Sequence, residues 1–508
     1  MEYAVEMRNI TKAFGDKAAN SGVNLGIQNG EILSLLGENG SGKTTLMNML
    51  SGIYYPDEGQ IFVRGREVTI RSPKDALDLG IGMIHQHFKL VDVFSAAENI
   101  ILGLHEQGSM DRKKIASRVR EICDRYGFHI DPNEKVYNMS VSQKQTLEII
   151  KVLYRGADIL ILDEPTAVLT PQETEKLFEV IRNMRADGKS IVIITHKLNE
   201  VMAVSDRVAV LRKGLNAGEV MTKDTTPQKL TEMMVGHSVS LNIQRDDPVY
   251  SETQLRVEHL SVRNSEGLLA LNDVSFTVRG GEILGVAGIS GSGQKELLEA
   301  IAGLQHAEPG ASVIYHSPEG KDSQLIGMKP LDIQNLGVHM SFVPEDRLGM
   351  GLVGSMGMSD NMMLKSYRSG KGLFTERKSP RDLATSVRDE LGVVTPSLNT
   401  PVRKLSGGNV QKVLVGREIA LAPNVLMMAY AVRGLDINTS YVIYNLLAEQ
   451  KRKGVAVIYV GEDLDVLLEL CDRILVLCGG VANEIAEART ATKDSIGYSM
   501  TYLKEGKA

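Results

Sequence analysis

A glycine-rich string near the start of the chain, GENGSGKT at residues 37–44, has the composition and spacing of a phosphate-binding loop. Its glycines let backbone N–H groups wrap phosphate oxygens, and a following helix N-terminus adds positive potential. Lys43 is expected to reach the β- and γ-phosphates of a nucleotide, and Thr44 to ligate Mg²⁺. A chance glycine-rich turn is disfavoured because an apolar strand pattern precedes the loop and a helical pattern follows it. The predicted phosphate-contacting residues are Gly37, Glu38, Asn39, Gly40, Ser41, Gly42, Lys43, Thr44 and Thr45.

Two acids follow a second apolar stretch. Ile159–Leu162 has the pattern of a buried strand, and Asp163 and Glu164 come directly after it. At the end of a strand, Asp163 can hold Mg²⁺ directly or through a water, and Glu164 can polarise an attacking water. The same two acids before Pro165 would also suit a turn or a helix N-cap, and the phosphate loop elsewhere in the chain favours the catalytic interpretation.

Two neutral side chains extend this set. His196 follows the apolar strand pattern 191–194, where an imidazole can hydrogen-bond a γ-phosphate, although a lone histidine is more often structural. Gln86 lies in the string MIHQHF, and a neutral amide can ligate Mg²⁺ and hydrogen-bond a water without competing as a base. The predicted catalytic residues are Glu164, His196 and Gln86, and the predicted Mg²⁺ ligands are Thr44, Gln86 and Asp163.

The sequence contains an internal duplication. GEILSLLGENGSGKTTLMNMLSG at residues 30–52 recurs as GEILGVAGISGSGQKELLEAIAG at residues 281–303, and SVSQKQTLEIIKVL from Ser140 recurs as SGGNVQKVLVGREI from Ser406. Each copy alternates apolar strand and helix patterns, which indicates an α/β fold. A polar stretch with a proline separates the copies. The predicted domains are therefore residues 1–240 and 254–508, joined by a linker at residues 241–253.

Composition excludes several other classes. With 508 residues, 43% hydrophobic and 24% charged, the chain is typical of globular proteins of several domains. A net charge of −6 argues against general nucleic-acid binding, and three cysteines without CxxC spacing argue against a disulfide framework or a structural zinc. The first residues lack the apolar region of a signal peptide, and no run approaches the roughly 18 apolar residues of a membrane helix. A role at a membrane would need a partner that spans it.

In their order along the chain, these motifs resemble the ATP-binding cassette (ABC) family over nearly the whole sequence. The string LSGGN at residues 405–409 is similar to the LSGGQ signature that separates this family from other phosphate-loop enzymes. The resemblance implies an α/β fold with two tandem phosphate-loop NTPase (ABC ATPase) domains, each with a mixed or parallel sheet core and a helical subdomain. It implies that Phe14 stacks on adenine, where the alternative is a core phenylalanine. It also implies that the signature contacts a nucleotide held by the opposite cassette, although Ser406 alone would suit an ordinary N-cap. The implied signature contacts are Ser406, Gly407, Gly408 and Asn409.

The two copies differ at the positions that carry this chemistry. Gln294 and Lys295 stand at the places of Lys43 and Thr44. A glutamine cannot neutralise phosphate charge, and an ammonium group cannot ligate Mg²⁺. The other replacements in the second copy are Ala429 and Tyr430 for the two acids, Glu462 for His196 and Glu345 for Gln86. The signature shows the opposite pattern, since the first copy has Val141 and Ser142 where the second has two glycines.

Head-to-tail pairing of cassettes, which the resemblance implies, turns this difference into two unequal sites. One site joins the motifs of the first copy to the LSGGN string of the second and is expected to hydrolyse ATP. The other is expected not to hydrolyse, and whether it binds nucleotide stays open. The residues of this degenerate site are Gly288, Gly291, Gly293, Gln294, Lys295 and Glu462.

Two cassettes in one chain without a membrane segment are similar to the duplicated ATPases of bacterial simple-sugar and nucleoside importers. The strings GMIHQHF (82–88) and YRGADILILDEPTAVLTPQE (154–173) favour the nucleoside branch, which works with a basic membrane lipoprotein. The alternative cargo is a simple sugar such as ribose or galactose. The resemblance implies ATP and Mg²⁺ as cofactors, two integral-membrane permease subunits, an extracytoplasmic substrate-binding lipoprotein and a peripheral place on the cytoplasmic face of the bacterial inner membrane. An ABC ATPase acting on ribosomes or DNA is disfavoured by the short linker and the acidic charge.

Overall fold

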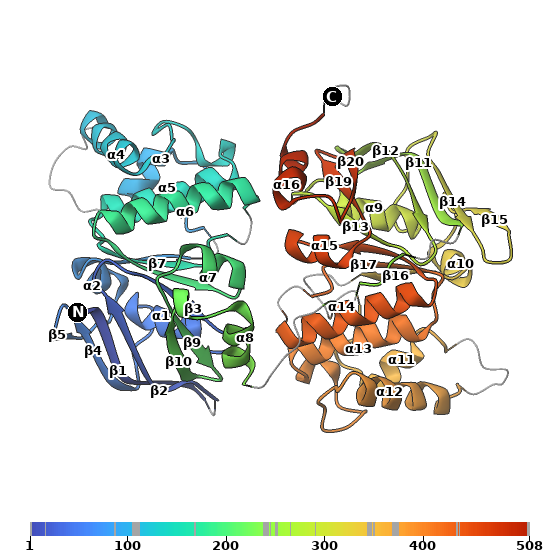
Figure 1. Cartoon of the computed structure of the whole chain (residues 1–508), viewed down its shortest axis with the longest axis horizontal. Helices are drawn as coiled ribbons and strands as arrows, with labels where there is room; N and C mark the ends of the chain where they lie inside the picture. Colours follow the sequence, from blue (N-terminus) through green and yellow to red (C-terminus); the bar gives the residue numbers. More distant parts are fainter. Residues whose placement is uncertain are drawn as a thin grey trace. The chain divides into compact units, whose positions relative to one another are not determined.

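The computed structural model shows two compact units, Met1–Ser240 (unit 1) and Leu241–Ala508 (unit 2) (Figure 1). It describes residues 3–15, 17–85, 88–103, 112–166, 169–236, 243, 245–248, 252–264, 266–289, 291–342, 348, 351–367, 375–432, 435 and 437–504. Two residues of the sequence analysis lie outside the described residues: Gln86, a predicted catalytic residue, and Glu345, which replaces it in the second copy. Among the described helices, none is both long and apolar enough to cross a bilayer.

Unit 1 alternates strands and helices. Its strands are Tyr3–Phe14 (β1), Lys17–Gln28 (β2), Ile32–Leu36 (β3), Glu58–Val63 (β4), Arg66–Val68 (β5), Ile81–Ile84 (β6), Ile159–Asp163 (β7), Ser190–Thr195 (β8), Arg207–Arg212 (β9) and Leu215–Met221 (β10). Its helices are Lys43–Leu50 (α1), Pro73–Asp78 (α2), Ala96–Ile101 (α3), Arg112–Tyr126 (α4), Val141–Tyr154 (α5), Pro171–Ala186 (α6), Leu198–Val204 (α7) and Pro227–Val235 (α8), with 3-10 turns at Val136–Asn138 and Thr222–Asp224.

Unit 2 repeats this order. Its strands are Thr253–Arg263 (β11), Leu269–Arg279 (β12), Ile283–Ala287 (β13), Ser312–His316 (β14), Asp322–Gln324 (β15), Val338–Phe342 (β16), Val425–Ala429 (β17), Ala456–Val460 (β18), Arg473–Cys478 (β19) and Val481–Glu487 (β20). Its helices are Gln294–Ile301 (α9), Pro330–Asn335 (α10), Met358–Met363 (α11), Lys378–Glu390 (α12), Gly407–Ala420 (α13), Ile437–Arg452 (α14), Leu464–Leu470 (α15) and Lys493–Thr501 (α16), with a 3-10 turn at Val402–Lys404.

Each unit contains a mixed sheet whose central strands are parallel. In the described residues of unit 1 the strand order is β10-β9-β3-β8-β7-β6, and only β10 runs antiparallel to its neighbour. Strands β3, β7 and β8 are buried along their whole length, which explains why their sequences are continuous apolar runs. Unit 2 has the corresponding order β20-β19-β13-β18-β17-β16. The predicted α/β fold with a mixed sheet core in each half is confirmed.

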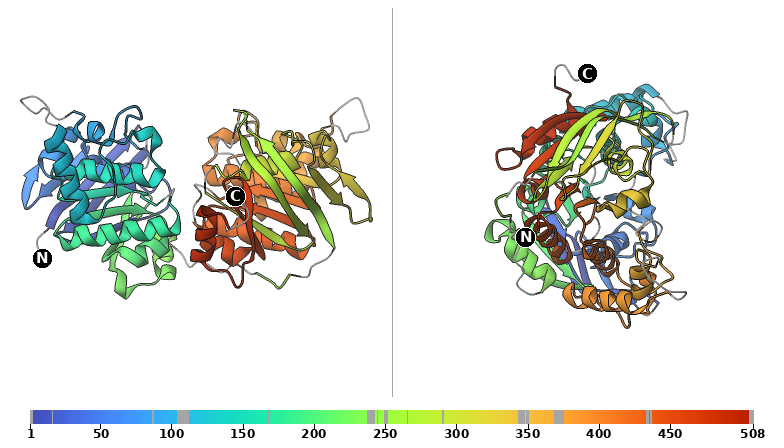
Figure 2. Two further views of the ribbon diagram at one scale, coloured as in Figure 1. Left: turned by 90° about the horizontal axis from the view of Figure 1, so that it is seen from above. Right: turned by 90° about the vertical axis from the view of Figure 1, so that its right-hand side faces the viewer.

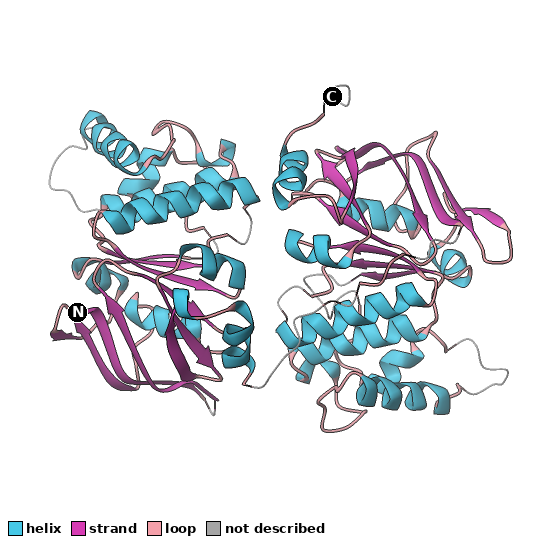
Figure 3. Cartoon of the chain, viewed as in Figure 1, coloured by secondary structure: helices cyan, strands magenta, loops and turns pink. Residues whose placement is uncertain are grey.

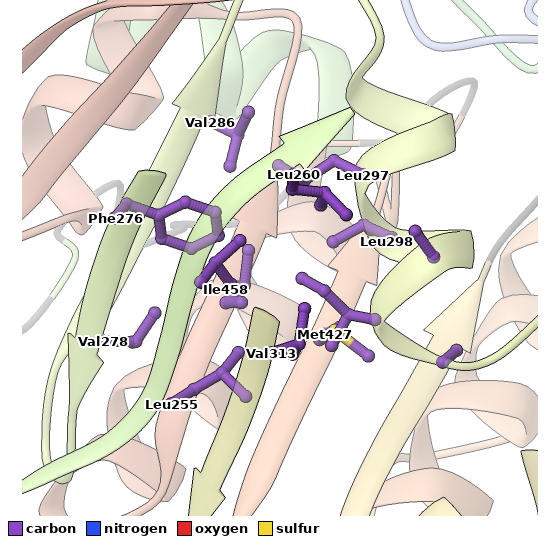
Figure 4. Close-up of a cluster of buried hydrophobic side chains, with 14 of the residues drawn as sticks. Leu255, Leu260, Phe276, Val278, Val286, Leu297, Leu298, Val313, Met427 and Ile458 are labelled. Carbon is purple, nitrogen blue, oxygen red and sulfur yellow. The ribbon is translucent and has the colours of Figure 1, made fainter. Parts of the chain in front are cut away.

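A second, antiparallel sheet packs against the first in each unit, and the sequence patterns above did not predict it. Its order is β2-β1-β4-β5 in unit 1 and β12-β11-β14-β15 in unit 2. Figure 2 shows the long yellow-green strands of this sheet in unit 2. In Figure 4, Leu255 and Phe276 of this sheet meet Leu297 of α9 and Ile458 of the mixed sheet in one apolar core. The helix that follows the phosphate loop is therefore held between two sheets.

The predicted helical subdomain is also present in each unit. Helices α3, α4 and α5 pack on one another in unit 1, and α11, α12 and α13 do so in unit 2, at the end of each unit away from its antiparallel sheet (Figure 3). Their shared apolar side chains include Val119 and Leu147 in unit 1 and Val387 and Val413 in unit 2. Helices α5 and α13 begin at the signature positions, so this subdomain positions them.

The stretch between the repeats packs against unit 2 where it is described. Ile243 is 5% exposed and lies in an apolar cluster with residues of α14 and α15. The Arg245 guanidinium donates to two carbonyl oxygens at the C-terminal end of α15, both at 2.8 Å. The Lys451 ammonium donates to the Asp246 carbonyl oxygen at 2.8 Å. These residues, which the sequence placed in a linker, are thus fixed on unit 2.

Candidate functional site

The phosphate loop of unit 1 joins buried strand β3 to helix α1. Gly42 caps the helix with a left-handed backbone (φ +97°), and a Cβ at this position would collide with the Ala19 carbonyl oxygen. The Lys43 ammonium donates to the carbonyl oxygens of Gly37 and Glu38, at 2.7 and 2.9 Å. These contacts hold the cation over the loop. An ammonium group has three protons, so a third can serve a phosphate oxygen.

The electrostatics of Lys43 and the nearby acids are coupled. Burial lowers the pKa of Lys43, and the charges of Glu164, Asp163 and Glu38 act against that shift. Burial and the neighbouring Glu164 charge raise the pKa of Asp163 to about 6, while a hydrogen bond from the Thr44 hydroxyl opposes the rise. A cation beside Asp163 would offset both causes of the raised pKa. The Thr44 hydroxyl and the Asp163 carboxylate are oxygen donors in contact, and this donor set fits Mg²⁺.

Glu164 sits in an unusual backbone conformation directly after β7. Its φ is +47°, and its N–H donates to the Ile194 carbonyl oxygen at 2.9 Å, which ties it to the end of β8. His196 Nδ1 lies 2.9 Å from Glu164 Oε1. This hydrogen bond lowers the pKa of Glu164, although burial acts in the opposite direction. The carboxylate is therefore held ionised at the carboxyl ends of two parallel strands, where a base could act on water.

Loop and acids together line a pocket of about 190 Å³. The structure thus brings together most of the residues that the sequence singled out in the first copy, and His196 joins them through Glu164. Glu38 contributes its carbonyl oxygen to Lys43, and Ser41 is buried within the loop. The residues that line the pocket are Asn39, Gly40, Gly42, Lys43, Thr44, Thr45, Asp163, Glu164 and Ile194.

Phe14 stands at the end of β1 with an exposed ring. It is 47% exposed, so the alternative of a core phenylalanine does not apply. The Tyr54 ring meets it edge to face, with centroids 5.2 Å apart, and the Lys12 ammonium lies 5.8 Å from its centroid. Asp57 holds this strand end by accepting from Lys12 at 2.7 Å and from the Ala13 N–H at 2.8 Å. Sequence reasoning missed Tyr54, although paired tyrosines after the glycine that ends α1 are a visible signal.

Phe14→Ala is expected to raise KM for ATP about 10-fold and to change kcat less than about twofold, because base stacking on an aromatic ring contributes ~1–3 kcal/mol to binding and not to phosphate chemistry. Steady-state phosphate release over a range of ATP concentrations measures both constants. Tyr498→Ala removes another exposed ring, from α16 of unit 2, and serves as the control. An unchanged KM in Phe14→Ala would exclude Phe14 from the base site.

Unit 2 keeps the shape of the phosphate loop without its charge. Gly293 has φ +94°, close to the value of Gly42, and Gln294 is 4% exposed. The Gln294 amide donates to the Ile289 carbonyl oxygen at 3.1 Å, at the place where Lys43 bonds to Glu38. Lys295 points to its own helix and pairs with Glu299 at 3.7 Å. Gln294 therefore replaces the structural contact of Lys43 and not its positive charge.

The strand end that carries the acids in unit 1 has the same backbone in unit 2. Tyr430 has φ +52°, and its N–H donates to the Val460 carbonyl oxygen at 2.9 Å, as Glu164 donates to Ile194. Ala429 before it is buried, and the Tyr430 ring packs against the apolar core of unit 2. A strained conformation is thus retained where the carboxylates have been replaced by a methyl group and a phenol.

The two signature segments differ in how their helices begin. Ser140 forms a capping box, because its Oγ accepts from the Gln143 N–H at 3.2 Å and its N–H donates to the Gln143 side chain at 2.8 Å. In the described residues at the start of α13, no helix N–H donates to the Ser406 side chain, and the Asn409 side-chain amide donates to Ser406 Oγ at 2.8 Å. Unit 2 therefore starts α13 with two bare glycines and backbone N–H groups that a ligand can reach.

Comparisons with known proteins agree with this architecture. A family model described as ABC transporter matches residues 20–167 and again residues 271–428. The chain is 42% identical over 517 residues to a guanosine import ATP-binding protein of Bacillus subtilis (strain 168), with 100% of both chains covered. It is 41% identical over 504 residues to a nucleoside import ATP-binding protein of Lactococcus lactis subsp. cremoris (strain MG1363), with 98% of each covered. It is 39% identical over 532 residues to a glucose import ATP-binding protein of Haloferax volcanii, with 98% of this chain and 95% of that one covered. The chain belongs to the ABC transporter family and carries two fused ATP-binding cassettes.

Proposed function

We propose that this chain is the ATP-hydrolysing, energy-coupling subunit of an ABC importer for nucleosides, and that ATP is cleaved at unit 1 and not at unit 2. The observation that carries the proposal is the internal comparison. Unit 1 gathers a buried lysine and two acids at one pocket, and a histidine contacts one of the acids. Unit 2 has the same backbone conformation at the corresponding positions, but Gln294 replaces the lysine and Tyr430 replaces the second acid.

The residues of unit 1 divide the reaction among them. The loop N–H groups and Lys43 bind the β- and γ-phosphates and neutralise their charge. Glu164 orients a water for attack on the γ-phosphorus, and the bond to the β–γ bridging oxygen breaks to give ADP and phosphate. His196 holds the Glu164 carboxylate in place. Thr44 and Asp163, with Gln86, would hold Mg²⁺, which supplies positive charge at the phosphates.

The LSGGN segment of a second unit would complete this site. Ser406, Gly407 and Gly408 lie at the N-terminus of α13, where backbone N–H groups favour an anion. In the head-to-tail pairing that we propose, the LSGGN segment contacts the catalytic pocket of unit 1, and the capped Ser140 segment contacts the degenerate phosphate loop of unit 2. One productive and one degenerate site then result. Opening and closing of the productive site would drive the membrane partners.

Relatives support a nucleoside cargo over a sugar. The two relatives with 42% and 41% identity are guanosine and nucleoside import proteins, and a glucose import protein follows at 39%. A simple sugar, with ribose and galactose as the expected choices, is the second candidate. The subunit would act at the cytoplasmic face of the membrane with two integral-membrane permease subunits and a substrate-binding lipoprotein.

Uptake in the native host tests the cargo. Cells deleted for this gene should lose uptake of radiolabelled guanosine and uridine, and the wild-type gene should restore it while Glu164→Gln should not. Uptake of labelled ribose, galactose and glucose in the same cells should stay at the wild-type level. Loss of sugar uptake with normal nucleoside uptake would replace the nucleoside assignment by the sugar one.

A further inference from the structure

An ion pair on α5, whose carboxylate is buried, binds the backbone of Lys89, a residue of the segment that follows Gln86. Glu148 is 3% exposed, and its carboxylate accepts from the Lys89 N–H at 2.7 Å. The Lys151 ammonium donates to the Lys89 carbonyl oxygen at 3.0 Å and to the Glu148 carboxylate at 3.2 Å. Both backbone polar groups of Lys89 are thus bound by side chains one helical turn apart. Lys89 stands three positions after Gln86.

A second contact of the same kind fixes the chain two residues later. The Asn99 side chain accepts from the Val91 N–H at 2.8 Å and donates to the Val91 carbonyl oxygen at 3.1 Å. Unit 2 repeats it, since Asn361 accepts from the Val353 N–H at 2.8 Å and donates to its carbonyl oxygen at 3.2 Å. Because the unit without the catalytic residues keeps it, this asparagine contact serves the common fold.

The contact at Lys89 is only half conserved between the units. Arg417 of unit 2 donates to the Gly351 carbonyl oxygen at 2.9 Å, as Lys151 does to Lys89. Leu414 stands at the place of Glu148, and a leucine side chain has no acceptor. The counter-ion has moved along α13, where Glu418 accepts from Arg417 at 2.7 Å. A carboxylate therefore lies near the cation in both units, but among the described residues only the one in unit 1 accepts a backbone N–H from the loop.

The comparison of the two units separates the role of Glu148 in charge balance from its role in binding the Lys89 N–H. A buried ion pair is an expensive way to stabilise a helix, because desolvation can exceed the Coulombic gain, and the pairing in unit 2 shows that the cation can be neutralised from a neighbouring position. The bond from Lys89 to Glu148 is therefore not required for charge balance. It occurs in the unit whose pocket carries Lys43, Asp163 and Glu164.

We propose that Glu148 is a positioning residue for ATP hydrolysis, which fixes the chain next to Gln86 by accepting the Lys89 N–H. Helix α5 packs on β6, which ends at Ile84, two positions before Gln86, and Glu148 on the same helix binds Lys89, three positions after it. A glutamine that ligates a metal and orients a water must be placed to within a fraction of an ångström, and small misplacement costs up to about 100-fold in rate. This inference rests on hydrolysis at unit 1.

Two variants of the full chain separate positioning from charge. Glu148→Gln keeps an oxygen that can accept the Lys89 N–H and removes the charge. The double variant Glu148→Leu/Val152→Glu moves the carboxylate to the position that it has in unit 2, because Leu414 and Glu418 occupy these places there. It keeps a counter-ion for Lys151 in an arrangement that folds in unit 2 and removes the acceptor. Tyr126→Phe is the control: Tyr126 ends the neighbouring helix α4, and the variant deletes the hydrogen bond (2.6 Å) that its hydroxyl donates to Asp187, just after α6.

Three readouts are taken on each variant: kcat and KM for ATP with Mg²⁺, amide hydrogen exchange of the peptide containing Lys89, and the thermal midpoint. The double variant should lower kcat about 10-fold or more, leave KM within about twofold and speed exchange at Lys89. Glu148→Gln should keep slow exchange and a kcat within about threefold of wild type, and Tyr126→Phe should keep both.

Fast exchange at Lys89 with wild-type kcat in the double variant would overturn the proposal, as would a kcat in Glu148→Gln as low as in the double variant while its exchange stays slow. A double variant that did not fold would be replaced by Glu148→Leu alone, with the same expectations. Failure of the proposed function is seen separately, because Glu164→Gln would then retain hydrolysis in the same assay.

Discussion

Glu164→Gln should lower kcat for ATP hydrolysis by at least about 100-fold, the usual contribution of a general base, and should leave ATP binding within about threefold. The amide cannot take up a proton from the attacking water, whereas the loop and Lys43, which hold the phosphates in the proposed site, are unchanged. The hydrogen bond to His196 lowers the pKa of Glu164, so the wild-type carboxylate is ionised at neutral pH. Phosphate release and binding of a fluorescent ATP analogue measure the two quantities.

The matched control for this variant lies in unit 2. Tyr430 has the backbone conformation of Glu164 and the same hydrogen bond to the neighbouring strand, so Tyr430→Phe changes the corresponding place without creating or removing a base. It should keep kcat within about twofold of wild type. Hydrolysis that survives Glu164→Gln would mean that the roles of the two units have been assigned the wrong way round.

Exchanging the signature residues should have the second large effect. Gly407→Val/Gly408→Ser gives α13 the two residues that follow Ser140 in α5, and kcat should fall about 100-fold or more, because side chains then stand where backbone N–H groups approach the γ-phosphate in the proposed pairing. Loss of one preorganised donor at a developing charge costs about 10²–10³ in kcat. Phosphate release is the measurement, with the thermal midpoint as the check on folding.

The reverse exchange provides the comparison. Val141→Gly/Ser142→Gly restores two glycines to unit 1, whose signature faces the degenerate loop in the proposed pairing, and kcat should stay within about twofold of wild type. The capping box at Ser140 shows that a helix with valine and serine at these places begins normally, so the forward variant is expected to fold. Equal losses in the two exchanges would exclude one productive site per chain.

Local patterns were sufficient for the strands and loops around the pocket. The apolar run before the phosphate loop is β3, and the one before Asp163 is β7; both are central parallel strands buried on two faces, so their sequences carry a strong signal. Parallel strands place their carboxyl ends at one edge, which explains why Glu164 and His196 lie together, but the sequence predicted a γ-phosphate contact for His196 and not its hydrogen bond to Glu164. The inequality of the two halves needed only a comparison of the chain with itself.

Other features were harder to predict. In strand β2 only the second half, Val23–Gln28, alternates apolar residues with polar or small ones, and several bulges interrupt the register of β2 with β1, so the periodicity argument did not detect the antiparallel sheet. The packing of Arg245 on α15 uses carbonyl oxygens, which every residue carries and which no sequence pattern marks. The bond from Lys89 to Glu148 joins a loop to a helix 59 positions away, and only the folded chain brings the two together.

The number of sites that cleave ATP in each chain tests the central claim most directly. Orthovanadate retains ADP at a site that has cleaved ATP, so the chain, assembled with its membrane partners, would be incubated with labelled ATP, Mg²⁺ and vanadate, and the retained ADP would be counted per chain. We predict one ADP per chain in the wild type and in Tyr430→Phe, and none in Glu164→Gln. Two ADP per wild-type chain, or retention that persists in Glu164→Gln, would contradict the account.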